Sequence, residues 1–273
     1  MRETTTDKEG GFLAQITDFS KVCNEAARAG GDVLLSWAGR FGVREKGPSD
    51  LVTEADLASQ EAIRDVLLGA FPDHGFLAEE NEQIASRSDD YRWIVDPLDG
   101  TMNYVHAVPN FAVSIALEQR GEVVVGTVYD PVSRECFSAA RGQGAWLNGQ
   151  RLRASGATDL AQALVAVSFS AKVRRDDREI DDFIEVLLRA QGTRRMGSSA
   201  INLCYVAAGR FDGYWSTSTK IWDIAAGALL VAEAGGVITA FDGGPLAIER
   251  PQFIAAATPE LHRELLNLLQ RHR

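Results

Sequence analysis

The feature that most restricts the fold of this chain is the stretch from Trp93 to Thr101, WIVDPLDGT. A run of apolar residues, typical of a buried strand, leads directly into Asp96 and Asp99, which are separated only by a proline and a leucine. Asp, Pro and Gly are residues that turns prefer, so an ordinary surface turn is one interpretation. Two like charges in one tight turn repel each other, however, unless a positive group lies between them. We therefore expect a strand end that presents both carboxylates to a cation, followed by a helix start at Thr101 whose free N–H groups would bind an anion.

The composition is that of an ordinary soluble globular protein. Of 273 residues, 45% are hydrophobic and 24% are charged, and the formal net charge is −10. This acidic balance argues against nucleic-acid binding as the main purpose, because duplex binding needs clustered Lys and Arg. The three cysteines have no metal-type or redox-type spacing and, with no signal peptide evident, predict a cytoplasmic location. No apolar run is long enough to span a bilayer, so no membrane partner is expected.

The order of the expected elements divides the chain into two halves. Residues 1–11 are polar and predict a flexible N-terminal tail, and residues 12–273 predict a single domain. In the N-terminal half, about 12–154, a long amphipathic helix over 12–37 and a second helix precede short β-rich segments separated by Gly and Asn-Gly turns. In the C-terminal half, about 155–273, strands and helices alternate as in α/β proteins. No linker separates the halves, so we expect one unit that combines α+β and α/β character.

Further acidic residues accompany the aspartate pair, and each has a simple structural explanation. Glu79 and Glu80 follow the apolar segment GFLA and are explained equally well as a charged strand end in solvent. Because adjacent strand residues point to opposite faces, at most one of the two should join Asp96 directly. Asp56 and Asp223 lie at expected helix starts, where an aspartate often serves only as a cap.

The acidic residues gain weight from their occurrence together and in this order. Four carboxylates form an all-oxygen set with no histidine or cysteine beside them: Glu79, Asp96, Asp99 and Asp223. Mg²⁺ is a hard cation that prefers carboxylates, water and phosphate oxygens, whereas zinc favours nitrogen and sulfur ligands. The set therefore predicts a magnesium site, and His106 is expected to be structural.

Five motifs carry these acidic residues. In chain order they are DLVTEAD, AEEN, WIVDPLDGTMNYVH, GSSAINLCYVAAGRFDGYW and WDIAAGALLVAEAGG. Together they resemble the inositol monophosphatase family of Mg²⁺-dependent phosphatases, over nearly the whole chain, and in this order they are highly specific. The resemblance implies a layered αβαβα sandwich of the inositol monophosphatase and sugar phosphatase type, and a homodimer.

The resemblance also implies the metal ligands. In the family, the positions that match Glu79, Asp96 and the backbone carbonyl of Leu98 bind a first ion. The positions that match Asp96, Asp99 and Asp223 bind a second ion, with Asp96 bridging the two. A third, weaker ion is associated with the position of Glu79. The implied cofactor is therefore Mg²⁺, as two ions with a third bound less tightly.

The catalytic positions follow from the same resemblance. Thr101 and Asp56 match the residues that hold the attacking water, Glu80 supports this network, and the amides of Gly100 and Thr101 cradle the phosphate. Lys46 matches a loop that closes over the metal site, with a solvated surface lysine as the alternative. In two-metal phosphoryl transfer one ion makes hydroxide available and the other neutralises the leaving oxygen, so no covalent phosphoenzyme is needed. The rival aspartate-nucleophile mechanism lacks its usual Asp-x-Asp motif here.

The substrate pocket departs from the family pattern at one position. Inositol-preferring members have a glutamate seven residues before the aspartate of the Trp-Asp motif, and in this chain that position is Ser216. Serine is short and uncharged, so it grips sugar hydroxyls less firmly than a carboxylate does, and Lys220 adds a positive charge nearby. Inositol phosphate is therefore a default substrate only.

The segment RRMGSS holds the other pocket candidates. Ser198 and Ser199 open a helix at the family's alcohol-binding position. Arg194 and Arg195 have two open interpretations: they meet a second phosphate or acidic group of the substrate, or they form salt bridges at a subunit interface.

We therefore predict a Mg²⁺-dependent phosphomonoesterase that hydrolyses a small polyol or sugar phosphate, by default inositol 1-phosphate, with a metal-activated water. The alternatives on the same scaffold are fructose-1,6-bisphosphatase, 3′-phosphoadenosine 5′-phosphate phosphatase and histidinol-phosphatase activity. An alternative of another class is a regulatory binding protein that retains the fold. Loss of a metal carboxylate would favour that alternative, and none is lost here. The expected partners are a phosphate ester and a second copy of the chain, with no nucleic acid and no membrane.

Overall fold

A computed structural model describes residues 5–47, 50–87, 90–170 and 172–270, without the side chains of 5–14, 45–47, 50 and 51. The helices are α1 Thr5–Trp37, α2 Glu54–Ala70, α3 Thr101–Val105, α4 Arg178–Leu187, α5 Ser199–Ala207, α6 Ile221–Glu233 and α7 Pro259–Gln270. A short 3₁₀ helix, η1, covers Leu160–Gln162. Within the described residues no helix is long and apolar enough to cross a membrane.

The strands form one hairpin and two larger sheets. The hairpin pairs β1 Val43–Gly47 with β2 Asp50–Thr53. The larger sheet has the order β10-β9-β8-β7-β6-β5-β3-β4. Its strands are β3 Gly75–Ala78, β4 Gln83–Ile84, β5 Tyr91–Asp99, β6 Ala112–Gln119, β7 Glu122–Asp130, β8 Glu135–Ala140, β9 Gly144–Leu147 and β10 Gln150–Arg151. The smaller sheet has the order β12-β11-β13-β15-β14. Its strands are β11 Leu164–Ser168, β12 Gly192–Arg194, β13 Gly213–Ser216, β14 Val237–Ala240 and β15 Phe253–Ala256.

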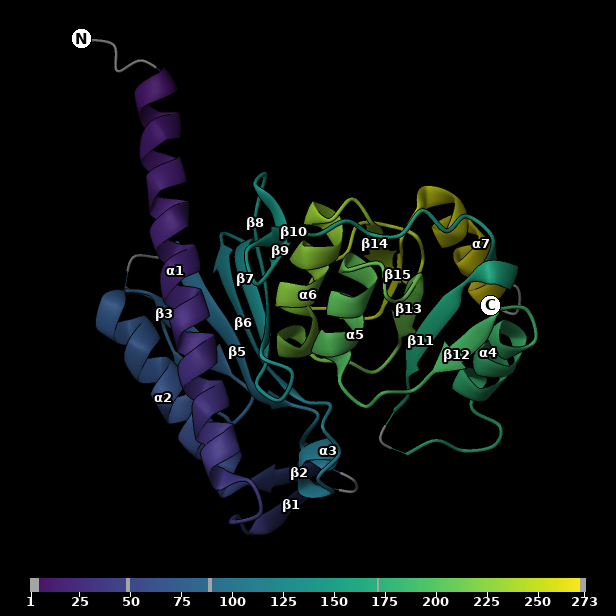
Figure 1. The fold of residues 1–273 in the computed structure, drawn as a ribbon, viewed down its shortest axis with the longest axis horizontal. Helices are drawn as coiled ribbons and strands as arrows, with labels where there is room; N and C mark the ends of the chain where they lie inside the picture. The colour runs from purple at the N-terminus through teal and green to yellow at the C-terminus, as the bar shows by residue number, and fades with distance from the viewer. Residues whose placement is uncertain (1–4, 48–49, 88–89, 171, 271–273) are drawn as a thin grey trace.

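Helices and sheets alternate in layers (Figure 1). Helices α1 and α2 cover one face of the eight-stranded sheet, and α5 and α6 lie between its other face and the five-stranded sheet. Helices α4 and α7 cover the outer face of the five-stranded sheet. This arrangement is the predicted αβαβα sandwich, because every sheet face needs an apolar helix face against which to pack.

The alternation of side chains along the strands explains why both faces of each sheet are buried. In β5, Trp93 and Val95 join the core against α1 and α2, whereas Ile94 joins the core against α5 and α6. In β13, Tyr214 faces α5 and α6, and Trp215 packs in the core that includes residues of α7. Successive strand residues point to opposite faces, so a continuous apolar run is what a strand between two helical layers requires.

Helix α1 begins at Thr5, within the segment 1–11 that the sequence pattern predicts as a tail. Its backbone continues through Gly10 and Gly11, because glycine weakens a helix without ending it. Residues 1–4 lie outside the described residues, and the flexibility of the tail stays a prediction.

Helix α6 is held closely between its neighbours by two glycines. A Cβ atom on Gly126 of β7 would lie 2.9 Å from the Cα atom of Ala226. A Cβ atom on Gly227 of α6 would lie 2.5 Å from Cδ1 of Leu203 in α5. Both contacts are shorter than van der Waals distance allows for a methyl group, so only glycine lets these backbones approach so closely. This packing fixes the position of α6, which carries Asp223 in its first turn.

Candidate active site

Asp96 and Asp99 lie at the end of β5, where the strand contains an irregularity. Asp96 pairs with Ser114 of β6 and Asp99 pairs with Ala112, so β5 has one more residue than its partner between the two pairs. Residues three apart in a regular strand face opposite sides, and one extra residue reverses that parity. Because Pro97 has no N–H to donate, it is suited to such an unpaired position. The bulge therefore turns both carboxylates toward the α5 and α6 side of the sheet.

Asp99 is bound to the first turn of α5. Its carboxylate accepts hydrogen bonds from the Ser198 hydroxyl, from the Ser199 amide at 3.2 Å and from the Ala200 amide at 2.7 Å. Ser198 is also the N-cap of α5, since its hydroxyl accepts a bond from the Ile201 amide at 3.2 Å. Burial raises the pKa of Asp99, and these hydrogen bonds oppose that shift. A carboxylate of the N-terminal half thus caps a helix of the C-terminal half.

Asp223 and Asp96 are each bound to a backbone amide close in sequence. Asp223 accepts a hydrogen bond from the Lys220 amide at 2.8 Å and so caps the start of α6. Asp96 accepts a bond from the Leu98 amide at 2.9 Å. Asp223 is therefore a helix cap, as the simpler interpretation predicts, and it also faces the cavity described below.

The acidic side chains lie close enough to perturb one another. The pKa of Asp96 is raised well above its usual range, first by burial and then by the charges of Glu79, Asp99 and Asp223. The pKa of Asp223 is raised in the same way by burial and by Asp99 and Glu79, while Lys220 opposes the shift. The structure therefore brings the four predicted carboxylates together into one mutually repelling set.

The two glutamates at the end of β3 separate as strand geometry requires. The Glu79 amide donates to the Val95 carbonyl at 3.1 Å, and its side chain lines the cavity. The Glu80 amide donates to the Gln60 side chain at 3.2 Å, and Glu80 is not among the residues that line the cavity. Only the first of the pair faces the other carboxylates.

Asp56 combines a capping role with a contact to Thr101. It is fully buried, and its carboxylate accepts bonds from the Thr53 amide at 2.8 Å and hydroxyl at 2.6 Å. The Thr101 hydroxyl lies 3.4 Å from the other oxygen of Asp56 and 3.1 Å from the Leu98 carbonyl. The cap predicted from sequence and the pairing of Asp56 with Thr101 therefore coexist.

The turn between β5 and α3 requires its glycine. Gly100 has a φ of 96°, and a Cβ atom there would lie 3.0 Å from the Asn110 carbonyl oxygen. The left-handed backbone and the close carbonyl both disfavour any other residue. The side chain of Lys46, which the sequence places near this site, lies outside the described residues.

The chemistry of the donor set fits a hard divalent cation. Within the described part of the chain, no group of three or more acidic, His or Cys side chains is already arranged to hold a metal ion. The Asp96 and Asp99 carboxylates instead accept the hydrogen bonds described above. All the converging donors are nevertheless oxygens, and the repulsion that raises the pKa of Asp96 and Asp223 is what a cation would offset.

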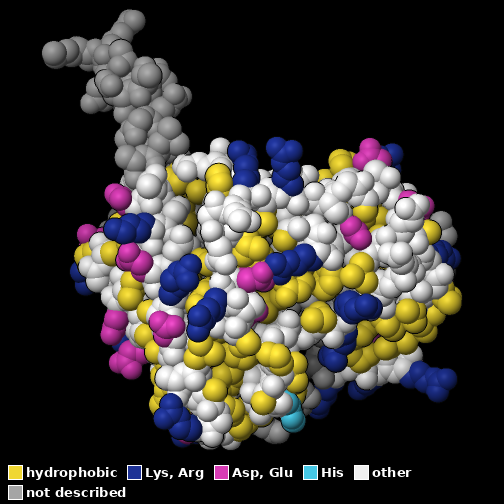
Figure 2. All heavy atoms as spheres, viewed as in Figure 1, with side chains coloured by type: hydrophobic (Ala, Val, Ile, Leu, Met, Phe, Trp, Pro, Cys, Tyr) yellow, Lys and Arg dark blue, Asp and Glu magenta, His cyan; other side chains and the backbone are white. Residues whose placement is uncertain are grey.

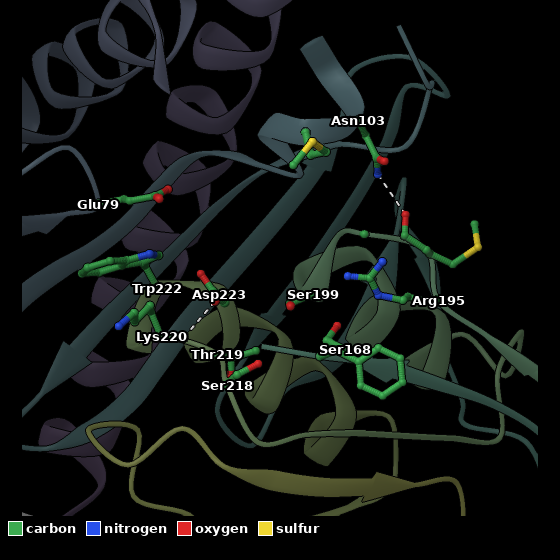
Figure 3. A pocket seen from close by; sticks show the side chains of 14 residues that line it. Glu79, Asn103, Ser168, Arg195, Ser199, Ser218, Thr219, Lys220, Trp222 and Asp223 are labelled. Atoms are coloured by element: carbon green, nitrogen blue, oxygen red, sulfur yellow. Dashed lines mark hydrogen bonds between the residues drawn. The ribbon is translucent and has the colours of Figure 1, made fainter. Parts of the chain in front are cut away.

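A cavity of about 650 Å³ adjoins these carboxylates (Figure 3). Its lining residues are Glu79, Met102, Asn103, Ser168, Phe169, Arg195, Met196, Gly197, Ser199, Ser218, Thr219, Lys220, Trp222 and Asp223. Its volume lies in the range of about 300–1,000 Å³ that is typical of small-molecule sites. Glu79, Asp223 and Lys220 lie at one side, and Arg195 projects from the opposite side.

Of the predicted pocket and phosphate-binding residues, Ser199, Lys220 and Arg195 line this cavity, whereas Ser216, Ser198, Arg194, Gly100 and Thr101 do not. Ser216 is fully buried at the end of β13, where it pairs with Ser168 and Phe253 on the neighbouring strands. Ser216 does not reach the cavity because it lies inside the sheet. After β13 the first residues that line the cavity are Ser218 and Thr219. Ser198 is 1% exposed and caps α5 instead.

Several lining residues escape the sequence reasoning, in particular Ser168 and Phe169. The Tyr214 hydroxyl bonds to the Ser168 hydroxyl at 2.8 Å and donates to the Ser199 hydroxyl at 3.0 Å, and the Phe169 ring meets the Phe183 ring edge-on. Burial raises the pKa of Tyr214 to about 12, so its hydroxyl stays protonated. One feature could have pointed to Ser168. It lies at the carboxyl end of β11, whose neighbours are parallel to it, and α/β proteins bind ligands at the carboxyl ends of such strands.

Comparison with known proteins agrees with the fold. Residues 15–273 match the model of the inositol monophosphatase family, so the chain belongs to that family. It is 41% identical over 253 residues to a protein of Pasteurella multocida named Nus factor SuhB, covering 91% of this chain and 94% of that one. It is also 41% identical over 227 residues to an inositol-1-monophosphatase of Rhizobium meliloti, covering 83% and 85%.

A solved structure shows the same architecture. The extragenic suppressor protein SuhB of Bartonella henselae superposes with a TM-score of 0.89 at 38% identity, covering 93% of this chain and 98% of that one. Family membership makes this chain a phosphoric monoester hydrolase, and phosphate esters are the corresponding substrate class.

Proposed function

We propose that this chain is a Mg²⁺-dependent phosphomonoesterase that hydrolyses a small polyol or sugar phosphate, with inositol 1-phosphate as the default substrate. The observation that carries the proposal is the convergence of buried, mutually repelling carboxylates beside a cavity of about 650 Å³. An inositol-1-monophosphatase is among the relatives with 41% identity, which supports the choice of default.

Each group at the site has a proposed role. Two Mg²⁺ ions would be held by a set of oxygen donors, with a third ion bound more weakly at the first of them: Glu79, Asp96, the Leu98 carbonyl, Asp99 and Asp223. When bound, Mg²⁺ supplies positive charge that stabilises the phosphoryl oxygens and makes hydroxide available near neutral pH.

The protein groups around that set would position the reactants. The carboxylate of Asp56 orients the Thr101 hydroxyl, and the two together would hold the attacking water in line with the phosphorus atom. Glu80 supports this network from the end of β3. The backbone amides of Gly100 and Thr101 would donate to the phosphate, and Ser199 would contact the alcohol portion from the cavity wall.

The first experiment measures phosphate release in Mg²⁺ and in EDTA from a panel of esters. The panel contains inositol 1-phosphate, glycerol 2-phosphate, fructose 1,6-bisphosphate, 3′-phosphoadenosine 5′-phosphate and histidinol phosphate. We expect turnover in Mg²⁺ that EDTA abolishes. Turnover that persists in EDTA, or none on any ester, would contradict the proposal. The ranking decides between inositol phosphate and the alternative sugar, nucleotide and histidinol phosphate substrates.

A regulatory binding role is the second candidate. It is favoured by the several relatives named Nus factor SuhB. The Asp96→Asn variant separates the two roles in a strain that lacks the gene. Rescue of that strain by Asp96→Asn protein would support a binding role, and rescue by wild type alone would support catalysis.

The homodimer and the cytoplasmic location are part of the same proposal. Light scattering coupled to gel filtration should give twice the mass of the 29.6 kDa chain. Fractionation of cells should recover the protein with cytoplasmic markers, and a monomer or a membrane fraction would contradict these two points.

A further inference from the structure

The charged residues that line the cavity are unevenly distributed. Glu79 and Asp223 belong to the acidic set, and Lys220 lies beside them, where its charge opposes the rise that burial causes in the pKa of Asp223. Arg195 is the remaining charged residue of the lining, and Figure 3 shows its guanidinium on the other side of the cavity. The cavity thus has an end that suits cations and a separate end that suits an anion.

The Arg195 side chain lies over an aromatic ring and keeps its N–H donors available. Its guanidinium carbon lies 5.5 Å from the centre of the Phe169 ring. Within the part of the chain that the structure describes, the side chain of Arg195 has no hydrogen bond or ion pair, whereas that of Arg210 bonds to Glu135. A cation–π contact attracts a guanidinium without using its N–H donors, which stay free to bind a phosphate or a carboxylate.

The backbone that follows Arg195 is anchored to the N-terminal half of the chain. The carbonyl of Met196 accepts hydrogen bonds from the side-chain amides of Asn103 at 2.9 Å and Asn110 at 3.0 Å. Gly197 follows with a φ of 84°, and a Cβ atom there would lie 2.9 Å from the Asn103 amide nitrogen. A segment that is already ordered loses little entropy when a ligand binds.

We propose that Arg195 binds a second anionic group on the alcohol portion of the substrate, so that esters with such a group are preferred to inositol 1-phosphate, the default of the proposed function. The inference rests on the proposed function, because the acidic end must hold the phosphate that is cleaved. A guanidinium can form two parallel charge-assisted hydrogen bonds with either a phosphate or a carboxylate. The cavity volume of about 650 Å³ leaves room for a molecule that bears both groups.

The test compares matched esters with and without the second anion. Fructose 1,6-bisphosphate is paired with fructose 1-phosphate, and 2-phosphoglycerate with glycerol 2-phosphate, so that the pairs separate a second phosphate from a carboxylate. For each pair kcat/KM is measured in wild type and in Arg195→Gln, Arg195→Lys and Arg194→Gln. Arg194 is the control, because it does not line the cavity and, among the described residues, its side chain bonds only to the Thr193 carbonyl, at 2.9 Å.

We expect wild type to prefer the doubly charged member of at least one pair. Arg195→Gln should reduce that preference about tenfold or more, mainly through KM, and Arg195→Lys should retain part of it. Arg194→Gln should keep the wild-type preference. If the enzyme hydrolyses monophosphates and shows no preference for the doubly charged esters, this inference is wrong while the proposed function stands. The same holds if Arg195→Gln keeps the wild-type preference.

A binding measurement covers the case in which no ester is hydrolysed, which would contradict the proposed function itself. The thermal midpoint is measured with each ester in Mg²⁺ for the same proteins. A larger rise with fructose 1,6-bisphosphate or 2-phosphoglycerate than with its partner, lost in Arg195→Gln and kept in Arg194→Gln, would support the anion site. Equal shifts in all the proteins would overturn it.

Discussion

Replacement of Gly126 by alanine tests how closely α6 must approach the eight-stranded sheet. The added Cβ atom would lie 2.9 Å from Cα, 3.1 Å from the carbonyl oxygen and 3.2 Å from Cβ of Ala226. These are atoms of the helix backbone and its first side-chain carbon, so no rotation of a side chain can relieve the contact. Strand β7 or helix α6 must move instead.

The expected loss of stability follows from the cost of inserting a methyl group into a packed interior. Overpacking of this kind costs about 1–3 kcal/mol in free energy of unfolding. For a chain of this size each kcal/mol lowers the thermal midpoint by about 2–4 °C, so we expect a fall of roughly 2–12 °C. Activity should fall as well, because Ala226 lies one helical turn after Asp223 and any shift of α6 moves that carboxylate.

Thermal unfolding and phosphate release of Gly126→Ala are measured beside a control glycine. Gly69 is exposed near the end of α2, and a Cβ atom there would meet nothing within 4 Å. Gly69→Ala should therefore leave activity unchanged and raise the unfolding free energy by about 0.5–1 kcal/mol, since alanine is the better helix former. If Gly126→Ala unfolds at the wild-type midpoint with wild-type activity, the inferred close approach of α6 to the sheet is wrong.

Three other predictions follow from the site and the core. Asp96→Asn should lower Mg²⁺-dependent turnover by more than about 100-fold, because it alters the proposed metal ligand at the centre of the acidic set. In EDTA the thermal midpoint of Asp96→Asn should equal or exceed that of wild type. A large fall in that midpoint would contradict the repulsion described for the carboxylates. Ser198→Ala should lower the unfolding free energy in urea by about 1 kcal/mol through loss of the α5 cap, whereas Ser218→Ala, at an exposed position, should change it by less than about 0.5 kcal/mol. Burial lowers the pKa of His74 below its usual 6.5, so the unfolded chain binds the proton more readily and stability should fall as pH drops through about 6.5. His74→Phe should flatten that part of the stability profile, and an unchanged slope would count against this histidine.

Local chemistry made the centre of the site predictable. An apolar run followed by Asp-Pro-x-Asp predicts a strand end with two carboxylates, and β5 ends at Asp99. The order of the strands and helices, together with the family motifs, also predicted the layered sandwich. The face on which Asp96 and Asp99 meet could not be predicted, because it depends on the extra residue in β5 relative to β6. A bulge is defined by its partner strand, so one segment alone does not reveal it.

Contacts between distant segments were harder to foresee. Asp99 binds the Ser199 and Ala200 amides, which lie about a hundred residues further along the chain. This contact depends on how α5 packs against the sheet, which the sequence near Asp99 does not reveal. Counting residues placed Ser216 in the pocket by analogy with a family position, but it ends a central strand and is enclosed by its neighbours. The lining instead comes from the residues just after the strand, since a loop can reach where a paired strand cannot.

The bonds from Asp99 to the start of α5 have a consequence for how the chain loses its structure. They join the half that contains the eight-stranded sheet to the half that contains the five-stranded sheet, and the Met196 carbonyl is joined in the same way to Asn103 and Asn110. A ligand at this junction binds only when both halves are folded against each other. By mass action it therefore raises the midpoint of one shared unfolding transition, and a melting curve reports binding in either half.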